Sequence, residues 1–324
     1  MKSILCFGDC NLDIIIPIRE IPVKGGCSFS SELSINMGGS GLNTAVALNR
    51  LKLKPVLLSK IGSDNFGTLL YDFLKSQGMQ VEHIQTSDLP TGVVVGLVNP
   101  DGEKRWISVR GNAADIHMTQ YNEALLQQYD VLYLSGVELA EGKESREIAI
   151  ELARKMKEKG GSVFLDPNIR VPTWKIDAAI KEAFRRIYPY VDVLLPNKKE
   201  LEMMGGNSNF SLDEKAKFIM SKGVSSIWLK LGGDGCTCYT QSGSRTFSGN
   251  RVEAIDTSGA GDAFNAAVIY GIITGMSQEE TGLFANFFAS HTVTKYGTTQ
   301  ALPSSSEIDS MIQKAKQASI GTTA

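Results

Sequence analysis

The sequence predicts an α/β fold, in which helices cover a mostly parallel central sheet and a small second β-sheet forms a lid. From about residue 130 onward, short apolar segments recur roughly every 30 residues and alternate with amphipathic, charge-rich segments. This alternation is typical of βαβ units on a parallel sheet. Nearer the N-terminus, two pairs of β-branched segments follow one another without a helix between them, and these pairs predict the second sheet.

The elements of the central layers follow from the spacing of apolar residues along the chain. The predicted strands span residues 4–7, 56–61, 131–134, 162–166, 191–196 and 226–230. The predicted helices span residues 43–51, 65–77, 144–159, 211–222, 260–273, 277–294 and 304–318. We expect the polar tail, residues 319–324, to fray.

The lid is predicted from two pairs of segments, 12–18 with 28–35 and 91–99 with 104–110. Pro100-Asp101-Gly102 separates the second pair and is a strong turn signal, so this pair is expected to form a β-hairpin. Strands in this order do not fit easily into a parallel sheet. We therefore expect a single domain over residues 1–324, with a lid of about residues 12–36 and 91–111 inserted in it.

The composition is that of a globular protein and excludes several classes of function. Of 324 residues, 42% are hydrophobic and 21% are charged, which excludes a disordered chain. The formal net charge is -2, so the basic excess typical of nucleic-acid binders is missing. No apolar run is long enough for a membrane helix, and the apolar stretch at the N-terminus is too short for a secretory signal. We expect a cytoplasmic protein with no nucleic-acid or membrane partner.

The cysteines and histidines give little support for a disulfide framework or a zinc site. The five cysteines are an odd number in two distant groups, which favours reduced thiols. The three histidines are far apart and form no HExxH motif.

The segment from Asp256 to Asp262 is the strongest motif for chemistry. Gly259-Ala260-Gly261 directly precedes a predicted helix, where free backbone N–H groups and a partial positive charge suit a phosphate. Asp262 falls in the first turn of that helix, where an acidic residue is a favourable cap. Alternatively, Asp262 accepts a proton from a hydroxyl that attacks a phosphoryl group held by the glycine amides.

Two long motifs together resemble one family. Residues 256–262 look like the C-terminal signature of the ribokinase-like (PfkB) family of carbohydrate and nucleoside kinases, and residues 38–45 and 60–67 look like its N-terminal signature. The resemblance covers nearly the whole chain. It implies a ribokinase-like three-layer sandwich with a lid, and transfer of the γ-phosphoryl group of ATP to a hydroxymethyl group of a small sugar.

The resemblance also implies a role for particular residues on the acceptor side. The residue matching Asp262 is the catalytic base in this family, and the amides matching Gly259, Ala260 and Gly261 form the anion hole. Substrate hydroxyls are held at positions that match Asn11, Asp13, Gly38, Gly39, Asn43 and Glu138. The alternative interpretation of Asp13 is a turn residue, and that of Glu138 is an ordinary acid at a helix start.

Two features bear on the choice of acceptor. Ser40 stands where many ribokinases carry Lys. Trp106 and Arg110 lie in the lid hairpin, where an Arg aimed into the site suits an acidic or phosphorylated sugar. Trp106 alternatively packs the lid or a dimer interface.

On the nucleotide side, the resemblance implies ATP-binding roles for Asn197, Glu200, Lys230, Gly232, Gly235 and Asn286. Asn197 and Glu200 match an N-x-x-E motif that tunes Mg²⁺ and phosphate binding, largely through water. The same spacing is also that of a helix capping box. A monovalent cation, K⁺, is implied beside the anion hole, at Asp256, Ser258, Thr292, Lys295, Gly297 and Ala301.

Other functions remain open at this stage. A nucleoside kinase of the same family shares these motifs, and Trp106 and Phe29 are the candidates for an aromatic shelf under a base. A non-catalytic sugar sensor is disfavoured because Asp262 and the glycines are intact. Neither a G-x-G-x-x-G after the first strand nor a Walker A motif is present, which argues against a dehydrogenase. An apolar lid such as residues 93–98 favours a homodimer that pairs lids.

Overall fold

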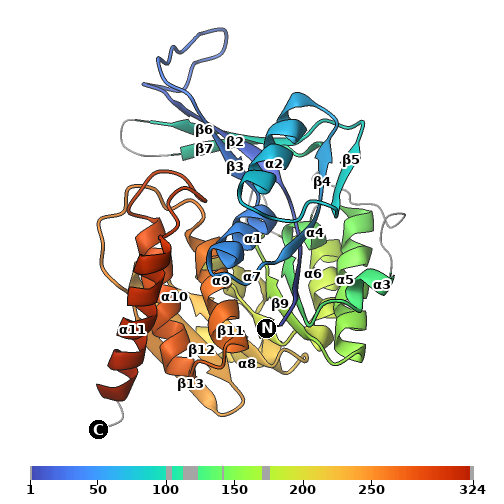
Figure 1. Ribbon diagram of the computed structural model, residues 1–324, viewed down its shortest axis with the longest axis vertical. Coiled ribbons are helices and arrows are strands. Elements are labelled where there is room, and N and C mark those ends of the chain that lie inside the picture. Colours follow the sequence, from blue (N-terminus) through green and yellow to red (C-terminus); the bar gives the residue numbers. More distant parts are fainter. Residues whose placement is uncertain (1, 100–103, 112–122, 141, 170–175, 322–324) are drawn as a thin grey trace.

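The computed structural model describes residues 2–99, 104–111, 123–140, 142–169 and 176–321. Its main body is a nine-stranded sheet in the order β13-β12-β11-β10-β9-β8-β1-β4-β5, in which only the pairs β11–β12 and β12–β13 are antiparallel (Figure 1). The predicted α/β class with a mostly parallel sheet is confirmed. The strands are β1 (Ile4–Phe7), β4 (Val56–Gly62), β5 (Ile84–Ser87), β8 (Val131–Ser135), β9 (Ser162–Asp166), β10 (Val193–Leu194), β11 (Ser226–Lys230), β12 (Gly235–Thr240) and β13 (Gly243–Ser248).

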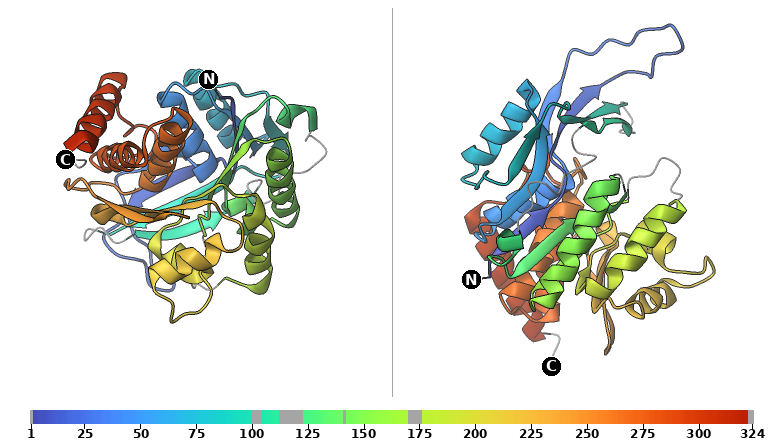
Figure 2. Two further views of the ribbon diagram at one scale, coloured as in Figure 1. Left: turned by 90° about the horizontal axis from the view of Figure 1, so that it is seen from below. Right: turned by 90° about the vertical axis from the view of Figure 1, so that its right-hand side faces the viewer.

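Helices cover both faces of this sheet, which gives three layers (Figure 2). Alternate side chains of a strand enter opposite cores: Ile4 and Cys6 pack with one helical layer, and Leu5 and Phe7 pack with the other. The first layer includes α1 (Ser40–Arg50), α9 (Ala260–Ile273), α10 (Gln278–Thr292) and α11 (Ser305–Gly321). The second includes α5 (Lys143–Glu158), α6 (Ala178–Ile187), α7 (Lys198–Met204) and α8 (Leu212–Met220). The remaining helices are α2 (Asn65–Ser76), α3 (Glu123–Leu126) and α4 (Val137–Ala140).

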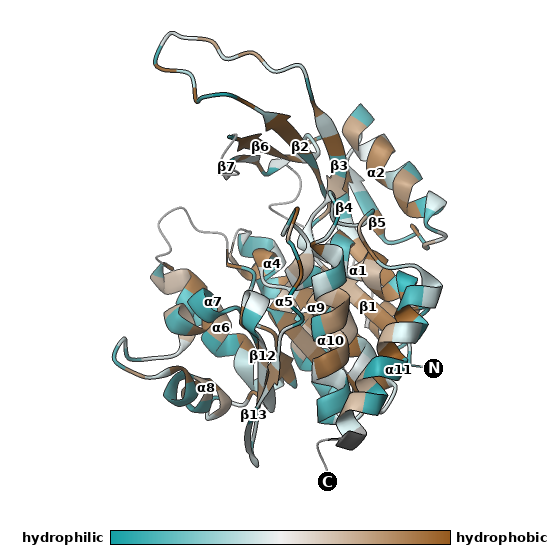
Figure 3. Ribbon diagram, turned by 90° about the vertical axis from the view of Figure 1, so that its left-hand side faces the viewer, coloured by the Kyte–Doolittle hydropathy of each residue, from teal (hydrophilic) through white to brown (hydrophobic). Residues whose placement is uncertain are grey.

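The second sheet has the order β3-β2-β6-β7 and lies beyond the carboxyl end of β1 (Figure 1). Its strands are β2 (Asn11–Pro17), β3 (Ser34–Gly38), β6 (Gly92–Val98) and β7 (Lys104–Val109). The register aligns Ile35, Ile14, Val95 and Ile107 in one row across all four strands. The neighbouring row is Asn36, Asp13, Val94 and Ser108. Because successive residues of a strand point to opposite faces, the row of Ile35 lies on an apolar face and the row of Asp13 on the face that carries the polar groups. Figure 3 shows the mixture of hydrophobic and hydrophilic residues along these strands.

Several predicted boundaries were wrong. The strand expected at 28–35 is β3 at Ser34–Gly38, because only those residues pair with β2. The strand expected at 191–196 shortens to the two residues of β10, and the first helix begins at Ser40 rather than residue 43. The last helix, expected to end at residue 318, extends through Gly321. The turn at Pro100-Asp101-Gly102 lies outside the described residues.

Asp64 connects the second sheet to the main body. Its side chain caps the N-terminus of α2 by accepting from Gly67 N at 2.8 Å. The same carboxylate accepts from the hydroxyl of Thr91 at 2.6 Å and from its N–H at 2.8 Å, just before β6. Burial alone would raise the pKa of Asp64, but these hydrogen bonds outweigh it and lower the pKa. The signature segment 60–67 thus fastens α2 to β6.

None of the helices in the described ranges combines the length and hydrophobicity that crossing a bilayer requires.

Candidate active site

The site is built at the carboxyl ends of the central strands, where the chain crosses from β1 into β2. Asp9 lies in that crossing, and its side chain accepts from Gly41 N at 3.1 Å. Gly39, the N-cap residue of α1, has no side chain that could cap the helix, so Asp9 supplies the cap instead. Gly39 has φ 98°, and a Cβ there would lie 2.5 Å from the Asp9 carbonyl oxygen. Only glycine permits this close crossing.

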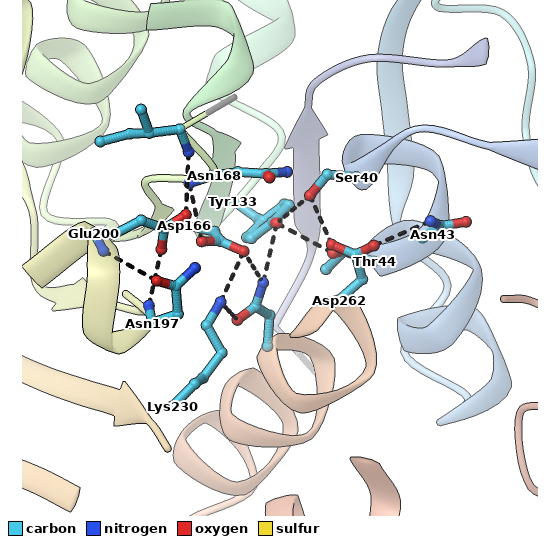
Figure 4. A network of polar contacts seen from close by, with 12 residues as sticks. Ser40, Asn43, Thr44, Tyr133, Asp166, Asn168, Asn197, Glu200, Lys230 and Asp262 are labelled. Carbon is cyan, nitrogen blue, oxygen red and sulfur yellow. Dashed lines mark hydrogen bonds and ion pairs between the residues drawn. The ribbon is translucent and has the colours of Figure 1, made fainter. Parts of the chain in front are cut away.

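Asp262 lies in the first turn of α9, and its carboxylate faces the start of α1 (Figure 4). Asp262 Oδ1 accepts from Ser40 Oγ at 2.7 Å, and Oδ2 accepts from Asn43 Nδ2 at 3.0 Å. The N-cap of α9, Gly259, is left-handed with φ 74°. Two donors from one helix thus orient a carboxylate that stands at the positive end of another.

A buried tyrosine extends this hydrogen bonding across the sheet (Figure 4). Tyr133, on β8, is fully buried, and its hydroxyl accepts from Thr44 Oγ1 at 3.1 Å and from Asn265 Nδ2 at 3.4 Å. It also lies 3.4 Å from Ser40 Oγ. Burial, and then the charges of Asp166 and Asp262, raise the pKa of Tyr133 well above its usual value. Because the phenol keeps its proton and two neighbours donate to it, that proton is available to Ser40.

Lys230 forms the other end of the same network. It ends β11, and its ammonium donates to Asp166 Oδ2 at 3.0 Å and to Asn265 Oδ1 at 3.2 Å. Asn265 Nδ2 in turn donates to Asp166 Oδ2 at 2.6 Å. Asn265 has no exposed surface, and the Lys230 and Asp166 side chains are 13% and 5% exposed. The buried Asp166 carboxylate and the largely buried Lys230 ammonium therefore form an ion pair between the ends of β9 and β11, which lie on either side of β10.

Asn197 and Glu200 form the capping box predicted from their spacing. Asn197 Oδ1 accepts from Glu200 N at 3.0 Å, and Glu200 Oε2 accepts from Asn197 N at 2.8 Å. Glu200 Oε1 also accepts from Ile169 N at 3.1 Å. Burial, and then the charge of Asp166, raise the pKa of Glu200 to about 7, although Lys230 and the backbone donors act in the opposite direction.

Of the predicted acceptor-side residues, Asn11, Asp13 and Gly38 lie together on the polar face of the small sheet. Asn11 Nδ2 donates to Asp13 Oδ1 at 2.8 Å, and a Cβ on Gly38 would lie 2.4 Å from Asp13 Oδ2. Arg110 follows β7 and lies 3.9 Å from Asp9 Oδ2. Trp106 is on this face as well, because a Cβ on Gly96 would meet its ring at 2.5 Å. Glu138 is buried in α4, directly after β8.

The residues assigned to the nucleotide loop lie between β11 and β12. Gly232 has φ 62°, with open space where a Cβ would stand. Gly235 has φ 100°, and a Cβ there would lie 2.1 Å from the Phe247 carbonyl oxygen, so the hairpin itself requires this glycine. Asn286, on α10, donates to the carbonyls of Phe247 and Ser248, both at 3.0 Å. Its amide nitrogen is therefore engaged in holding β13.

The residues assigned to a monovalent cation lie on two loops that Asp256 joins. Its carboxylate accepts from Ser258 N at 3.0 Å and from Gly297 N at 3.2 Å. The loop after α10 thus runs beside the loop before α9. The other predicted positions are on the same stretch: Thr292 ends α10, Lys295 is exposed, and Ala301 is buried. In the described part of the chain, no three His, Cys, Asp or Glu side chains are grouped closely enough to hold a metal ion.

Tyr133, Asp166 and Asn265 were not predicted from the sequence. The signal for Asp166 was present, since it is the last residue of a buried strand and Pro167-Asn168 follows it, and polar residues at that end of a parallel sheet gather at its site. Asn168 has φ 38°, an unusual conformation for a residue other than glycine. Tyr133 and Asn265 lie inside a strand and a helix, where they resemble ordinary core residues.

Comparison with known proteins identifies the family of this fold and site. A model of the pfkB family of carbohydrate kinases matches residues 1–305. Fructokinase-2 from Solanum lycopersicum is 28% identical over 314 residues, which cover 94% of each chain. The 2-dehydro-3-deoxygluconokinase of Bacillus subtilis (strain 168) is 27% identical over 293 residues, which are 89% of this chain and 90% of that one. The crystal structure of a ribokinase from Thermotoga maritima superposes with a TM-score of 0.84 at 26% identity, over 97% of this chain and 100% of that one.

Proposed function

Because the chain belongs to the pfkB family of carbohydrate kinases, we propose that it transfers the γ-phosphoryl group of ATP to a hydroxymethyl group of a small sugar. Phosphotransfer to an alcohol is the activity of the family. The finer assignment depends on one observation: Asp262 stands at the N-terminus of α9, beside Gly259 to Gly261, and is oriented by Ser40 and Asn43.

In the proposed reaction Asp262 is the general base. It accepts the proton of the acceptor hydroxyl while that oxygen forms a bond to the γ-phosphorus and the bond to the β–γ bridging oxygen breaks. The amides of Gly259, Ala260 and Gly261 bind the developing negative charge at the positive end of α9. Asn197 and Glu200 would hold Mg²⁺ largely through water, since their side-chain oxygens also accept from backbone N–H groups, and the ion would supply positive charge for the polyphosphate. Gly232 and Gly235 flank the nucleotide, and Asn286 orders the strand beside it.

The small sheet is the proposed lid over the acceptor, inserted in a single domain of residues 1–324. Asp13 accepts hydrogen bonds from two sugar hydroxyls, and the absence of a side chain at Gly38 and Gly39 lets the sugar approach the backbone. Asn11, Asn43 and Glu138 complete the acceptor site. Closing the lid excludes water and so suppresses hydrolysis of ATP.

A monovalent cation, K⁺, is proposed beside the anion hole. The Asp256 carboxylate and the backbone oxygens of the two loops that it joins are the type of ligand that K⁺ takes. The ligand positions are Asp256, Ser258, Thr292, Lys295, Gly297 and Ala301. Turnover measured with K⁺ and then with tetramethylammonium at equal ionic strength tests this site, because only K⁺ fits it.

The apolar face of the lid is proposed to pair with the same face of a second copy. Ile35, Ile107 and Val109 are 43%, 56% and 53% exposed on this face, which has no charged residue in the row from Ile35 to Ile107. Sedimentation equilibrium of wild type and Ile107→Glu tests the dimer. The variant is expected to be monomeric, whereas a dimeric variant, or a monomeric wild type, contradicts the proposal.

The activity is tested by ADP release from Mg·ATP with a panel of sugars, sugar acids and nucleosides. One acceptor is expected to raise turnover far above the background hydrolysis of ATP. Asp262→Asn should lower kcat by orders of magnitude and leave ATP binding intact, because it removes the base and not the anion hole. A variant that retains turnover refutes the assignment of the base.

A second candidate is a nucleoside kinase, which one observation favours. Trp106 is 48% exposed on the lid face that also carries Asp13, where an indole ring can stack on a base. Arg110, directly after the same strand, instead favours a sugar acid. The panel separates these acceptors. A Trp106→Ala variant that loses nucleosides but keeps sugars would assign the ring to base stacking.

A further inference from the structure

Lys230 lies beside the proposed anion hole. If a Cβ is placed on Gly261, the one described atom within 4 Å, apart from its chain neighbours and the backbone of α9, is the ammonium nitrogen of Lys230, at 3.7 Å. Among the described residues outside α9, only this positive charge therefore approaches the exposed side of Gly261. An anion placed there would meet that charge and the backbone N–H groups of the helix start together.

The ammonium is held in position but retains bonding capacity. It has three N–H donors, and its hydrogen bonds in the described part of the chain are to Asp166 and Asn265. Both partners are buried, and Asn265 belongs to α9 itself, three residues beyond Asp262. Lys230 is thus fixed relative to the helix that carries the proposed base, with one donor left for a ligand.

From this arrangement we propose that Lys230 is a catalytic residue that binds the γ-phosphoryl group of ATP over Gly261. This inference rests on the proposed kinase function. As the γ-phosphorus moves from the bridging oxygen to the acceptor oxygen, Lys230 keeps all its protons and stabilises the negative charge on the transferred group. Asp166 and Asn265 position the ammonium when no phosphate is bound. The charge of Asp166 offsets part of the cost of placing the ammonium in this largely buried position.

The test compares two nucleotides that differ in the γ-phosphoryl group. Dissociation constants of Mg·ADP and of the Mg complex of the β,γ-imido ATP analogue are measured by calorimetry without any sugar. Lys230→Met should weaken the binding of the analogue by about 10- to 100-fold more than it weakens the binding of ADP, as expected for the loss of a hydrogen bond between charged groups. The kcat for the best acceptor should fall by about 100-fold or more. Equal weakening of both nucleotides, or of neither, overturns the proposal.

Two further variants separate this role from folding. The control variant is Lys215→Met. Lys215 is a buried lysine on α8, and its ammonium donates to Asn207 O at 2.7 Å, so its loss should leave both dissociation constants unchanged. Lys230→Gln keeps a donor for Asp166 and removes the charge, so it should fold where Met is not tolerated and show the same selective loss. Nucleotide binding is measured without an acceptor, so it tests Lys230 separately from the kinase activity. If the wild type binds the analogue more tightly than ADP but phosphorylates no acceptor in the panel, the kinase assignment is contradicted and the role of Lys230 in binding is not.

Discussion

Ser40 is expected to control the pH range in which the proposed base works. Its hydroxyl donates to Asp262 Oδ1 at 2.7 Å, and a hydrogen bond to a charged group contributes about 1.5–3 kcal/mol. Ser40→Ala removes that bond from the ionised carboxylate alone. At 1.36 kcal/mol per pH unit, the acidic limb of the kcat/KM profile should move to higher pH by about one to two units.

The assay is the initial rate of ADP release between pH 4.5 and 8.5 at saturating ATP, with the acceptor varied. At pH 8 the base is ionised in both proteins, so the variant should there lose much less activity than on the acidic side. Ser59→Ala is the matched control, because Ser59 is a buried serine of β4 whose hydroxyl has no hydrogen-bond partner among the described residues. Its profile should coincide with wild type. An acidic limb that stays in place in Ser40→Ala refutes the reasoning.

Three other predictions concern the frame around the base. Gly259→Ala should lower kcat about 100-fold, since φ 74° disfavours a side chain and its Cβ would lie 2.9 Å from that of Thr298, which displaces the anion-hole amides; steady-state kinetics measures this. Glu200→Gln should remove a pH dependence of the free energy of unfolding. Because the pKa of Glu200 is raised to about 7, its contribution to wild-type stability is present at low pH and is lost as the pH rises through 7; urea denaturation in EDTA between pH 5 and 8 measures this. Asp64→Ala should lower the free energy of unfolding by about 2 kcal/mol at pH 7, where the lowered pKa leaves the carboxylate ionised, and this loss should shrink as pH falls below about 4.

The parts of the site that could be predicted are those encoded in continuous segments. Asp262 and the three preceding residues lie on one loop and one helical turn, so their sequence alone indicates an anion site. Asn197 and Glu200 are three residues apart on one helix start, and the capping box follows from that spacing. In each case the interacting groups are local, and local groups meet whatever the rest of the fold does.

The parts that could not be predicted depend on distant segments. The helix α1 begins at Ser40 because Asp9, 32 residues from Gly41, caps it, whereas the sequence from Gly38 to Gly41 is typical of a loop. The bounds of β3 are determined by its pairing with β2. The residues of the segment alone therefore predicted this strand too early in the chain, at 28–35 instead of 34–38. Tyr133 and Asn265 are 132 residues apart and acquire a polar role only when β8 and α9 meet.

The same long-range contacts connect the lid to the proposed base. Asp9 caps the start of α1 and lies 3.9 Å from Arg110, which follows β7, while α1 carries both donors to Asp262. If the small sheet closes as proposed, its movement would reach Asp262 through the end of a helix rather than through a loop. In an enzyme whose catalysis is mostly positioning, such a connection aligns the base when the acceptor is enclosed. Because Ser40 and Asn43 already hold the carboxylate without a substrate, the proposed closure would refine the position of an ordered base rather than create one.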